Sequence, residues 1–464
     1  MSKNKIIILN FIFVLLITSG FGCTLNPFKK RPLELKPVKL SVWSVYEDSS
    51  SLKPLFDKYH ELHPTITIKY KKFSIDEYED QLLEAWAEDR GPDIYFLPNN
   101  WIAKYKNKIT PLPSKIKLPY RETKSSGIGN FQKVDIIDSV KEVRTTSLND
   151  LTQNYPGVVY EDVVKNDGKS NKIYGLPLSL DTLGLFYNED LLRYANISFP
   201  PETWTEFNSM VKNISLLNQD NDFEQSGTAL GTTNNITNSV DILMLLMFQN
   251  GVNLIRPDNR INLEDEDTQN LAIEAINFYN DYSNPIKEVY SWNKDQDQAL
   301  DAFINGQVAF FFGYPYHLSQ IKSRVTNKFN LKTAKIPQIK DTLRPSNFAN
   351  YWVMTVSHKT KNANPAWGFI DFATRKENVK MYLEKTKKPT ALKSLKDAQA
   401  NNLELKPFAD QILTAKSWYR GNSPEKAEEY IIEVIDKIKS GSLKLKEIRE
   451  LLSNTSIKIN QTIK

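Results

Sequence analysis

The sequence of 464 residues has very few cysteines and histidines: one cysteine, Cys23, and four histidines. A single cysteine excludes an internal disulfide, and 40% hydrophobic content is enough for cores that fold without cross-links. His60 and His63 are three residues apart and precede Pro64, whereas a zinc-protease helix needs histidines four residues apart. We therefore predict no catalytic residue, no metal site and no cofactor.

Other common functional motifs are also missing. The sequence has no G-x-S-x-G motif, phosphate loop or dinucleotide fingerprint. The stretch "NQDNDFEQSG" begins like a calcium loop but has Gln225 where the sharp turn requires glycine. Lysine and glutamate are interleaved and the net charge is only +5, so no nucleic acid is expected as a partner. A glycosidase with paired carboxylates stays open, because the sequence does not show how far apart acidic residues lie in space.

The N-terminus has the pattern of an export signal. Lys3 and Lys5 precede an apolar stretch at positions 6–17, and small residues follow. This stretch is too short to span a bilayer comfortably. We predict that residues 1–22 are a signal peptide and that no later segment crosses a membrane.

Cys23 directly follows this signal and has a glycine before it. That arrangement resembles the lipobox of bacterial lipoproteins, in which the thiol carries a lipid and becomes the mature N-terminus. The resemblance implies lipidation of Cys23, and residues 23–37, with three prolines, suit a tether between lipid and folded domain. The alternative is a small buried or incidental cysteine.

Strand and helix patterns alternate over residues 38–97. Apolar residues alternate with polar ones in "VKLSVWSVY" and "TITIKY", and "DIYFL" follows as a third strand. Between them, apolar residues recur at helical spacing, and Ser74 with Glu77 forms a capping box before the second helix. This order predicts an α/β fold with parallel strands covered by helices.

The ends of the first and third strands combine tryptophan with polar side chains. Trp43 and Glu47 lie at the first end, and Asn99 and Trp101 at the third. Ligands of open α/β sheets bind outside the carboxyl ends of the strands. These four residues therefore predict a site for a polar but partly apolar ligand. Core packing is the alternative for both tryptophans.

The pattern weakens from Ser114 to Lys172, where we expect a helical insertion or long surface loops. It returns as a strand over residues 183–187, with a helix beginning near Asn188. Further on, we expect a helix capped by Asn364 and opened by Pro365. The chain ends in amphipathic helices.

Six stretches in this order resemble a known family. They are "GPDIYFLPNNW", "YGLPLSLDTLGLFYNEDLL", "PPETWTEF", "FINGQVAFFFGY", "NPAWGFIDFAT" and "KKPTALKSL". The chain is similar to the extracellular solute-binding lipoproteins of ABC importers, in the carbohydrate-binding branch of maltose-binding-protein-like receptors. The resemblance covers most of the chain after residue 38.

The resemblance implies a type II periplasmic-binding-protein-like fold. Two discontinuous α/β lobes, joined by a hinge of crossing segments, would enclose a cleft. Lobe one would comprise residues 38–182 and 351–388, and lobe two residues 183–350 and 389–464.

The resemblance also adds residues to the predicted cleft. Sugar rings lie flat on aromatic side chains, while their hydroxyls need paired donors and acceptors. Beyond the strand-end residues, the family pattern implies ligand contacts by seven residues: Asp181, Tyr314, Tyr316, Tyr351, Trp352, Trp418 and Tyr419. Core packing is the alternative for each aromatic, whereas a buried carboxylate such as Asp181 is costly without a partner.

The implied function is solute capture without catalysis. A monomer held on the outer face of the cytoplasmic membrane by its lipid would bind a mono- or oligosaccharide and deliver it to an ABC transporter permease. Two rival functions stay open: an exported lipoprotein enzyme acting on glycans, and a sensor or adhesion lipoprotein with a degenerate cleft. The sequence does not name the solute, because related receptors take peptides, polyamines or glycerol phosphates.

Overall fold

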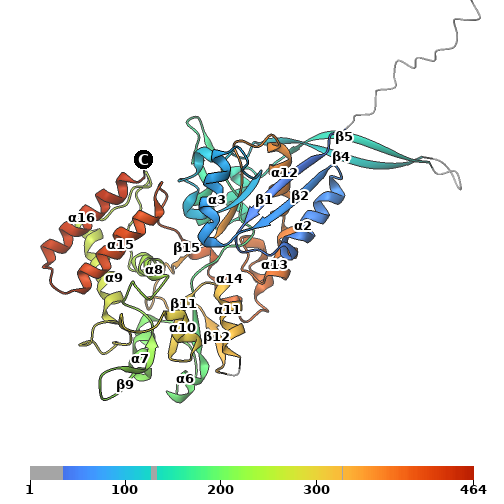
Figure 1. Ribbon diagram of the computed structural model, residues 1–464. Helices are drawn as coiled ribbons and strands as arrows, with labels where there is room; N and C mark the ends of the chain where they lie inside the picture. Colours follow the sequence, from blue (N-terminus) through green and yellow to red (C-terminus); the bar gives the residue numbers. More distant parts are fainter. Residues whose placement is uncertain (1–34, 127–132, 327, 464) are drawn as a thin grey trace, which may run out of the picture.

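The chain folds into two lobes that lie side by side (Figure 1), and we call the region between them the crevice. The computed structural model describes residues 35–126, 133–326 and 328–463. The predicted signal peptide and Cys23 lie outside these residues. Each lobe has its own sheet and its own hydrophobic core, so the prediction of a two-lobe α/β fold is confirmed.

Lobe one is built on a four-stranded sheet in the order β14-β3-β1-β2. Its strands are β1 (Val38–Ser44), β2 (Ile66–Lys72), β3 (Ile94–Pro98) and β14 (Trp352–Val356). Its helices are α2 (Ser49–Leu62), α3 (Ile75–Ala87), α12 (Ala363–Ala373) and α13 (Lys376–Thr386), with the short turns η1 (Asn99–Trp101) and η2 (Lys106–Lys108). β1 pairs in parallel with β2 and β3, as the alternation of strands and helices predicted. The parallel strands direct their carboxyl ends toward the crevice.

The segment after β3 differs in part from the expected helical insertion or long surface loops. It contains a long antiparallel hairpin of β4 (Lys115–Ser126) and β5 (Lys133–Arg144), then α4 (Leu148–Asn154), α5 (Gly157–Val163), β6 (Val164–Asn166) and β7 (Asn171–Ile173). Ile116 and Leu118 are buried against α12, where Leu118 lies so close to Gly368 that a β-carbon there would clash. One face of the hairpin thus belongs to the core. The helices α4 and α5 agree with the expectation, whereas the hairpin was missed because Pro119 and many charged residues obscure its alternating pattern.

The start of α12 also differs from the prediction. The helix begins at Ala363, with Asn362 at its N-cap position. Pro365 therefore lies inside the first turn, where a missing backbone N–H costs no helical hydrogen bond. The prediction that Asn364 caps the helix was wrong by two residues.

Lobe two has a five-stranded sheet in the order β12-β8-β11-β10-β9. Its strands are β8 (Gly184–Asn188), β9 (Leu216–Leu217), β10 (Phe223–Thr228), β11 (Val308–Gly313) and β12 (Leu331–Ala334). Its helices are α6 (Glu189–Tyr194), α7 (Trp204–Ile214), α8 (Ser239–Gln249), α9 (Glu266–Asp281), α10 (Ala299–Ile304), α11 (Tyr316–Val325), α14 (Lys406–Asp410), α15 (Pro424–Lys439) and α16 (Leu445–Gln461). As predicted, a helix begins next to Asn188: this residue caps α6 by accepting from two backbone N–H groups.

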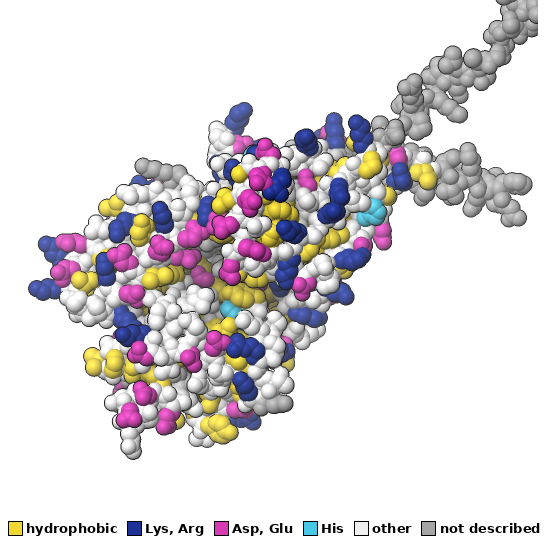
Figure 2. All heavy atoms as spheres, in the orientation of Figure 1, with side chains coloured by type: hydrophobic (Ala, Val, Ile, Leu, Met, Phe, Trp, Pro, Cys, Tyr) yellow, Lys and Arg dark blue, Asp and Glu magenta, His cyan; other side chains and the backbone are white. Residues whose placement is uncertain are grey.

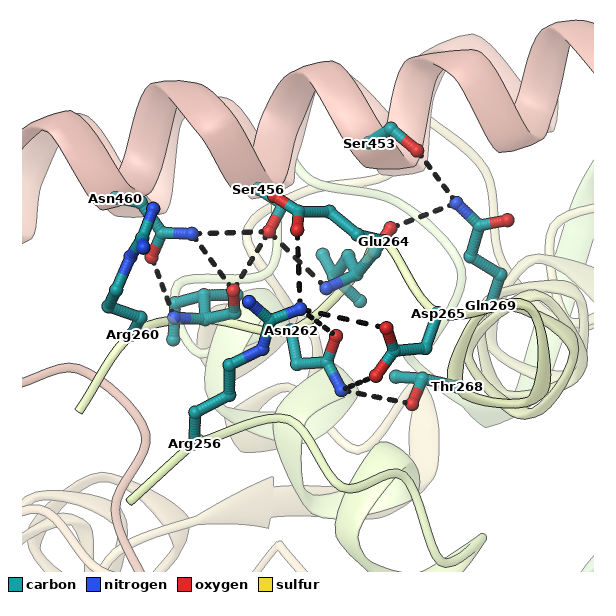
Figure 3. A network of polar contacts seen from close by, with 12 residues as sticks. Arg256, Arg260, Asn262, Glu264, Asp265, Thr268, Gln269, Ser453, Ser456 and Asn460 are labelled. Carbon is teal, nitrogen blue, oxygen red and sulfur yellow. Dashed lines mark hydrogen bonds and ion pairs between the residues drawn. The ribbon is translucent and has the colours of Figure 1, made fainter. Parts of the chain in front are cut away.

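The last helix is fixed to lobe two by a polar network (Figure 3). Asn460 accepts from the backbone N–H of Ile261 at 2.7 Å and donates to its carbonyl at 2.9 Å, and Ser456 donates to the same carbonyl at 2.8 Å. Nearby, Arg256 donates to Asn262 at 3.0 Å. These side chains satisfy the backbone of the loop before α9, so α16 is an integral part of the lobe.

Several crossing segments lie side by side between the lobes. The backbone N–H of Leu183 donates to the carbonyl of Phe348 at 3.1 Å, and the backbone N–H of Asn350 donates to the carbonyl of Asp181 at 3.0 Å. The short strands β13 (Asn347–Phe348) and β15 (Ala415–Lys416) pair next to them. Crossing backbones joined in this way form a hinge about which the lobes can rotate.

The third change of lobe comes later in the chain than the predicted boundary between residues 388 and 389. Leu392 and Leu395 still pack in the core of lobe one, and Leu405 is the next residue in the core of lobe two. Ile412 and Ala415 return to the first core. This connecting region contains the short turns η3 (Lys393–Leu395), η4 (Asp397–Gln399) and η5 (Ile412–Thr414).

Candidate functional site

Aromatic side chains from both lobes meet in the crevice. Tyr46, just after β1, and Tyr316, at the start of α11, are 43% and 37% exposed. Their rings are nearly parallel, with centroids 6.0 Å apart. Trp352 meets Tyr46 edge-on at 5.4 Å, and Tyr314 is stacked on Tyr316 at 5.7 Å. We call Tyr46, Tyr314, Tyr316 and Trp352 the crevice aromatics. Tyr46, Tyr316 and Trp352 are at least partly exposed and offer ring faces and edges to a ligand, whereas Tyr314 is buried and supports Tyr316 from behind by stacking.

Two side chains of lobe two hold the tyrosine pair in place. The hydroxyl of Tyr314 donates to Oδ2 of Asp241 at 2.6 Å, and its backbone N–H donates to Nδ1 of His317 at 2.9 Å. Burial lowers the pKa of His317 to about 4, so this imidazole is neutral at pH 7. Since Nδ1 accepts a hydrogen bond, the ring proton is assigned to Nε2. His317 thereby fixes the turn that presents Tyr316.

Glu47 lies in a buried ion pair beneath Tyr46. Its Oε1 accepts from Lys388 at 2.6 Å and from the Tyr382 hydroxyl at 2.7 Å, and its Oε2 accepts from Ser44 at 3.0 Å. Burial is the largest influence and acts to raise the pKa of Glu47, but Lys388, Tyr382 and Ser44 together outweigh it and the net shift is downward. Glu47 is therefore ionised and fully partnered within the protein.

Asp181 lies in the first crossing segment and has no such partner. Its side chain is only 7% exposed, and its Oδ1 is buried without a hydrogen-bond donor. Burial raises the pKa of Asp181 to about 6; Lys388 opposes this shift and Glu47 adds to it. A buried polar atom without a partner is costly in free energy. Asp181 is thus prepared to accept a hydrogen bond from a bound molecule.

Asn99 and Tyr351 lie in a different cluster from the crevice aromatics. Both donate to Oδ2 of Asp162 at 2.9 Å. Ser417 also donates to Asp162, and Arg420 donates to its Oδ1 at 3.3 Å. Because these residues come from several segments that meet at the hinge, Asp162 acts as its polar centre. In this arrangement Asn99 and Tyr351 face a protein carboxylate.

The remaining predicted aromatics make their ring contacts with residues other than Tyr46 and Tyr316. Trp43 packs on Phe73 with centroids 4.6 Å apart, and Trp101 is partly exposed beside Tyr105 at 5.7 Å. Trp418 and Tyr419 are adjacent in lobe two and are only 4% and 2% exposed. The structure thus brings together Asp181, Tyr314, Tyr316, Trp352 and Glu47 of the predicted set. The ligand contacts themselves stay predictions.

Four residues of this region were missed by the sequence reasoning: Tyr46, Asp241, Lys388 and Glu428. Glu428 lies on α15, where burial and then the charge of Asp241 raise its pKa to about 8. Tyr46 lies inside the strand-end stretch already singled out, and Asp241 is a lone acid in the otherwise apolar α8. Both could have been found from these signals. Lys388 and Glu428 carry no local signal, because their roles depend on contacts with distant segments.

Neither a membrane span nor a metal centre is found in the part of the chain that the structure describes. Each helix there is too short or too polar to cross a bilayer. The same residues contain no group of three or more His, Cys, Asp or Glu side chains arranged to hold a metal ion.

Comparison with known proteins gives a consistent match. The family described as "Bacterial extracellular solute-binding protein" matches residues 43–380. The chain is 25% identical over 278 residues to the "Multiple sugar-binding protein" of Streptococcus mutans, covering 57% of this chain and 63% of that protein. It is 27% identical over 246 residues to the "Maltodextrin-binding protein MdxE" of Bacillus subtilis, covering 50% and 54%. The matches therefore span less than two thirds of these relatives.

The fold is also that of a solved protein. A cyclo/maltodextrin-binding protein complexed with maltotetraose has a TM-score of 0.68 to this chain at 18% identity. The alignment covers 92% of this chain and 98% of that structure. At this identity the likeness shows a shared two-lobe fold.

Proposed function

The chain belongs to the family of bacterial extracellular solute-binding proteins, and from this premise we propose that it is the substrate-binding component of an ABC importer that captures a mono- or oligosaccharide. The relatives named for sugar and maltodextrin binding support a carbohydrate ligand. The observation that carries the proposal is the set of crevice aromatics contributed by both lobes, next to the unpartnered carboxyl of Asp181. Pyranose faces and hydroxyls need this combination.

Binding requires a change at the crevice. The rings of Tyr46 and Tyr316 are 6.0 Å apart, whereas a sugar between two aromatic faces needs about 3.5–4 Å of carbon contact on each side. A pyranose does not fit between them at this spacing. The ligand therefore either separates the two tyrosines or lies beside them against Trp352, and in both cases the hinge must adjust. Contacts to both lobes then favour the closed form, which the permease recognises.

No catalytic step is part of this proposal. Capture and delivery depend only on the different affinities of the open and closed forms for the ligand. A glycan hydrolase would use the same aromatics but would release product. Prolonged incubation with oligosaccharides should therefore leave them intact, and product release would replace this function with the enzyme alternative.

The lipid anchor at Cys23 belongs to the same proposal. The described chain begins just before β1, whose carboxyl end is directed at the crevice. A tether at residues 23–37 would thus be attached at the opposite end of lobe one and would leave the crevice open. Mass spectrometry of the exported protein tests the lipid, and a Cys23→Ala variant should be released from the membrane fraction.

Ligand binding is tested by unfolding of the purified protein in the presence of saccharides. A ligand at a hundred times its dissociation constant should stabilise the folded state by about 2.7 kcal/mol. Neutral mono- and oligosaccharides, amino saccharides, polyamines and short peptides form the panel. Stabilisation by peptides or polyamines alone would refute a saccharide receptor.

A further inference from the structure

The crevice carries more negative charge than its neighbouring cations balance. Figure 2 shows Asp and Glu side chains gathered along the crevice between the lobes. Three carboxyl groups stand out because none forms an ion pair in the described part of the chain: Asp181 at the first crossing, Asp241 on α8 and Glu428 on α15. They come from separate segments and converge on one region.

The three groups are close to each other and to the tyrosine pair. Asp241 accepts from Tyr314, which is stacked on Tyr316. The pKa of Tyr316 is raised mainly by burial, and the charges of Tyr46, Asp241 and Asp181 raise it further. Burial likewise raises the pKa of Glu428 to about 8, and the charge of Asp241 is the next largest cause. Asp181 and Asp241 thus lie near Tyr316, and the charge of Asp241 adds to the cost of ionising Glu428.

The cations around this region already have carboxylate partners. Lys388 is held by Glu47 at 2.6 Å, and Lys104 is held by Glu79 at 2.6 Å and by Glu425 at 2.9 Å. Arg420 of the hinge centre is likewise paired, with Glu161 at 2.7 Å and Asp162 at 3.3 Å. Lys388 thus has one carboxylate partner, and Lys104 and Arg420 have two each, so none of these cations has positive charge to spare. Its pKa of about 8 leaves Glu428 mostly protonated at pH 7, so the charge of Asp181 and Asp241 is left for a ligand to neutralise.

We propose that the crevice binds a saccharide bearing a protonated amine, whose ammonium group lies against Asp181 and beside the crevice aromatics. This inference rests on the proposed function and narrows its ligand class. The buried, unpartnered Oδ1 of Asp181 offers an acceptor, and Asp241, the hydrogen-bond partner of Tyr314, adds negative potential next to the tyrosine pair. Faces of Tyr46 and Tyr316 attract a cation through their ring quadrupole.

A neutral saccharide fits this environment less well. Its hydroxyls can donate to Asp181 but leave the carboxylate charges uncompensated as closure excludes water. An ammonium group supplies three donors and one positive charge at the same place. The structure therefore favours an amine over a hydroxyl at one position of the sugar ring.

The test compares sugars that differ at this one group. Glucosamine and its β-1,4-linked oligomers are the amine probes; glucose with cello-oligosaccharides, and the N-acetylated forms, are the neutral probes. Calorimetric titration at pH 7 should give at least tenfold tighter binding of an amine probe than of its neutral counterparts. Because the contact is ionic, added salt should reduce this difference.

Charge-removing variants identify the carboxylate that is involved. Asp181→Asn keeps the shape of the side chain and should weaken binding of the amine probe at least tenfold more than it weakens binding of its neutral counterpart. Asp241→Asn should have the same effect to a smaller extent. Asp220→Asn, on an exposed turn of lobe two, is the matched control and should bind like the parent protein. Circular dichroism and unfolding confirm that each variant is folded.

The outcomes separate the two proposals. If neutral saccharides bind as tightly as their amine counterparts, the amine preference is refuted and the saccharide receptor stands. If no saccharide binds, both proposals fall. If spermidine binds and amine sugars do not, the ligand is a polyamine and the proposal of a saccharide ligand is refuted. A preference that survives Asp181→Asn would remove Asp181 from the site.

Discussion

Replacing Asp181 by asparagine should make the ligand-free protein more stable. In the folded state, burial raises the pKa of Asp181 from its ordinary 3.8 to about 6. Since one pKa unit is 1.36 kcal/mol, keeping this side chain ionised destabilises the fold by about 3 kcal/mol at pH 8. Asparagine has a similar shape and no charge. The gain should therefore approach 3 kcal/mol at high pH.

The sign and the pH window of this effect follow from proton linkage. A folded-state pKa above the unfolded value means that the folded protein binds the proton more tightly. Ionisation therefore destabilises the parent protein as the pH rises from about 4 to about 6. The stability difference between Asp181→Asn and the parent protein should be near zero at pH 4, rise across this range and level off by pH 7.

Urea unfolding of protein refolded without ligand measures this difference between pH 4 and pH 8. Refolding is needed because a sugar retained from the cell would stabilise only the binding-competent parent protein. Asp220→Asn serves again as the control and should give a flat difference. A difference that is independent of pH, or a variant that is less stable at pH 8, would refute the claim that Asp181 is a buried, unpartnered carboxylate.

Three further predictions concern the surroundings of the crevice and the last helix. Lys388→Met should destabilise the protein by about 3–5 kcal/mol in urea unfolding at pH 7, because it leaves Glu47 buried without its cation. His317→Gln should remove up to about 3 kcal/mol of acid sensitivity between pH 6.5 and pH 4, measured by unfolding, because burial lowers the pKa of His317 to about 4 and the unfolded chain binds its proton first. Asn460→Ala should cost about 2–3 kcal/mol and increase hydrogen exchange at Ile261, because it removes two buried hydrogen bonds to that backbone; unchanged exchange there would contradict the anchoring of α16.

The fold of both lobes could be predicted because local patterns carry it. The strands and helices of residues 38–98 follow from alternation and capping, and the structure pairs β1 in parallel with β2 and β3. The β4–β5 hairpin escaped prediction since only one of its faces packs on the protein, and its other face is charged. A two-stranded arm of this kind owes its order to contact with α12, which the sequence pattern does not reveal.

The site could be predicted only in part, because ligand contacts depend on which side chains remain without partners. Asn99 and Glu47 both lie at strand ends, as expected, but Asp162 and Lys388 occupy their polar atoms. These partners are 63 and 341 residues away in the sequence. Asp181 is recognisable from sequence as a costly buried carboxylate; that its Oδ1 stays unpartnered is visible only in three dimensions.

The position of Asp181 connects ligand charge to lobe closure. Its backbone carbonyl accepts from Asn350 of the second crossing segment, so the carboxyl group lies within the hinge itself. In the absence of ligand this carboxylate costs free energy, and a bound donor or cation relieves that cost where the lobes rotate. Ligand binding should therefore stabilise the parent protein more than it stabilises Asp181→Asn, although the variant is the more stable protein without ligand. The free energy by which the Asp181 carboxylate destabilises the ligand-free protein thus contributes to the affinity for a ligand that partners it.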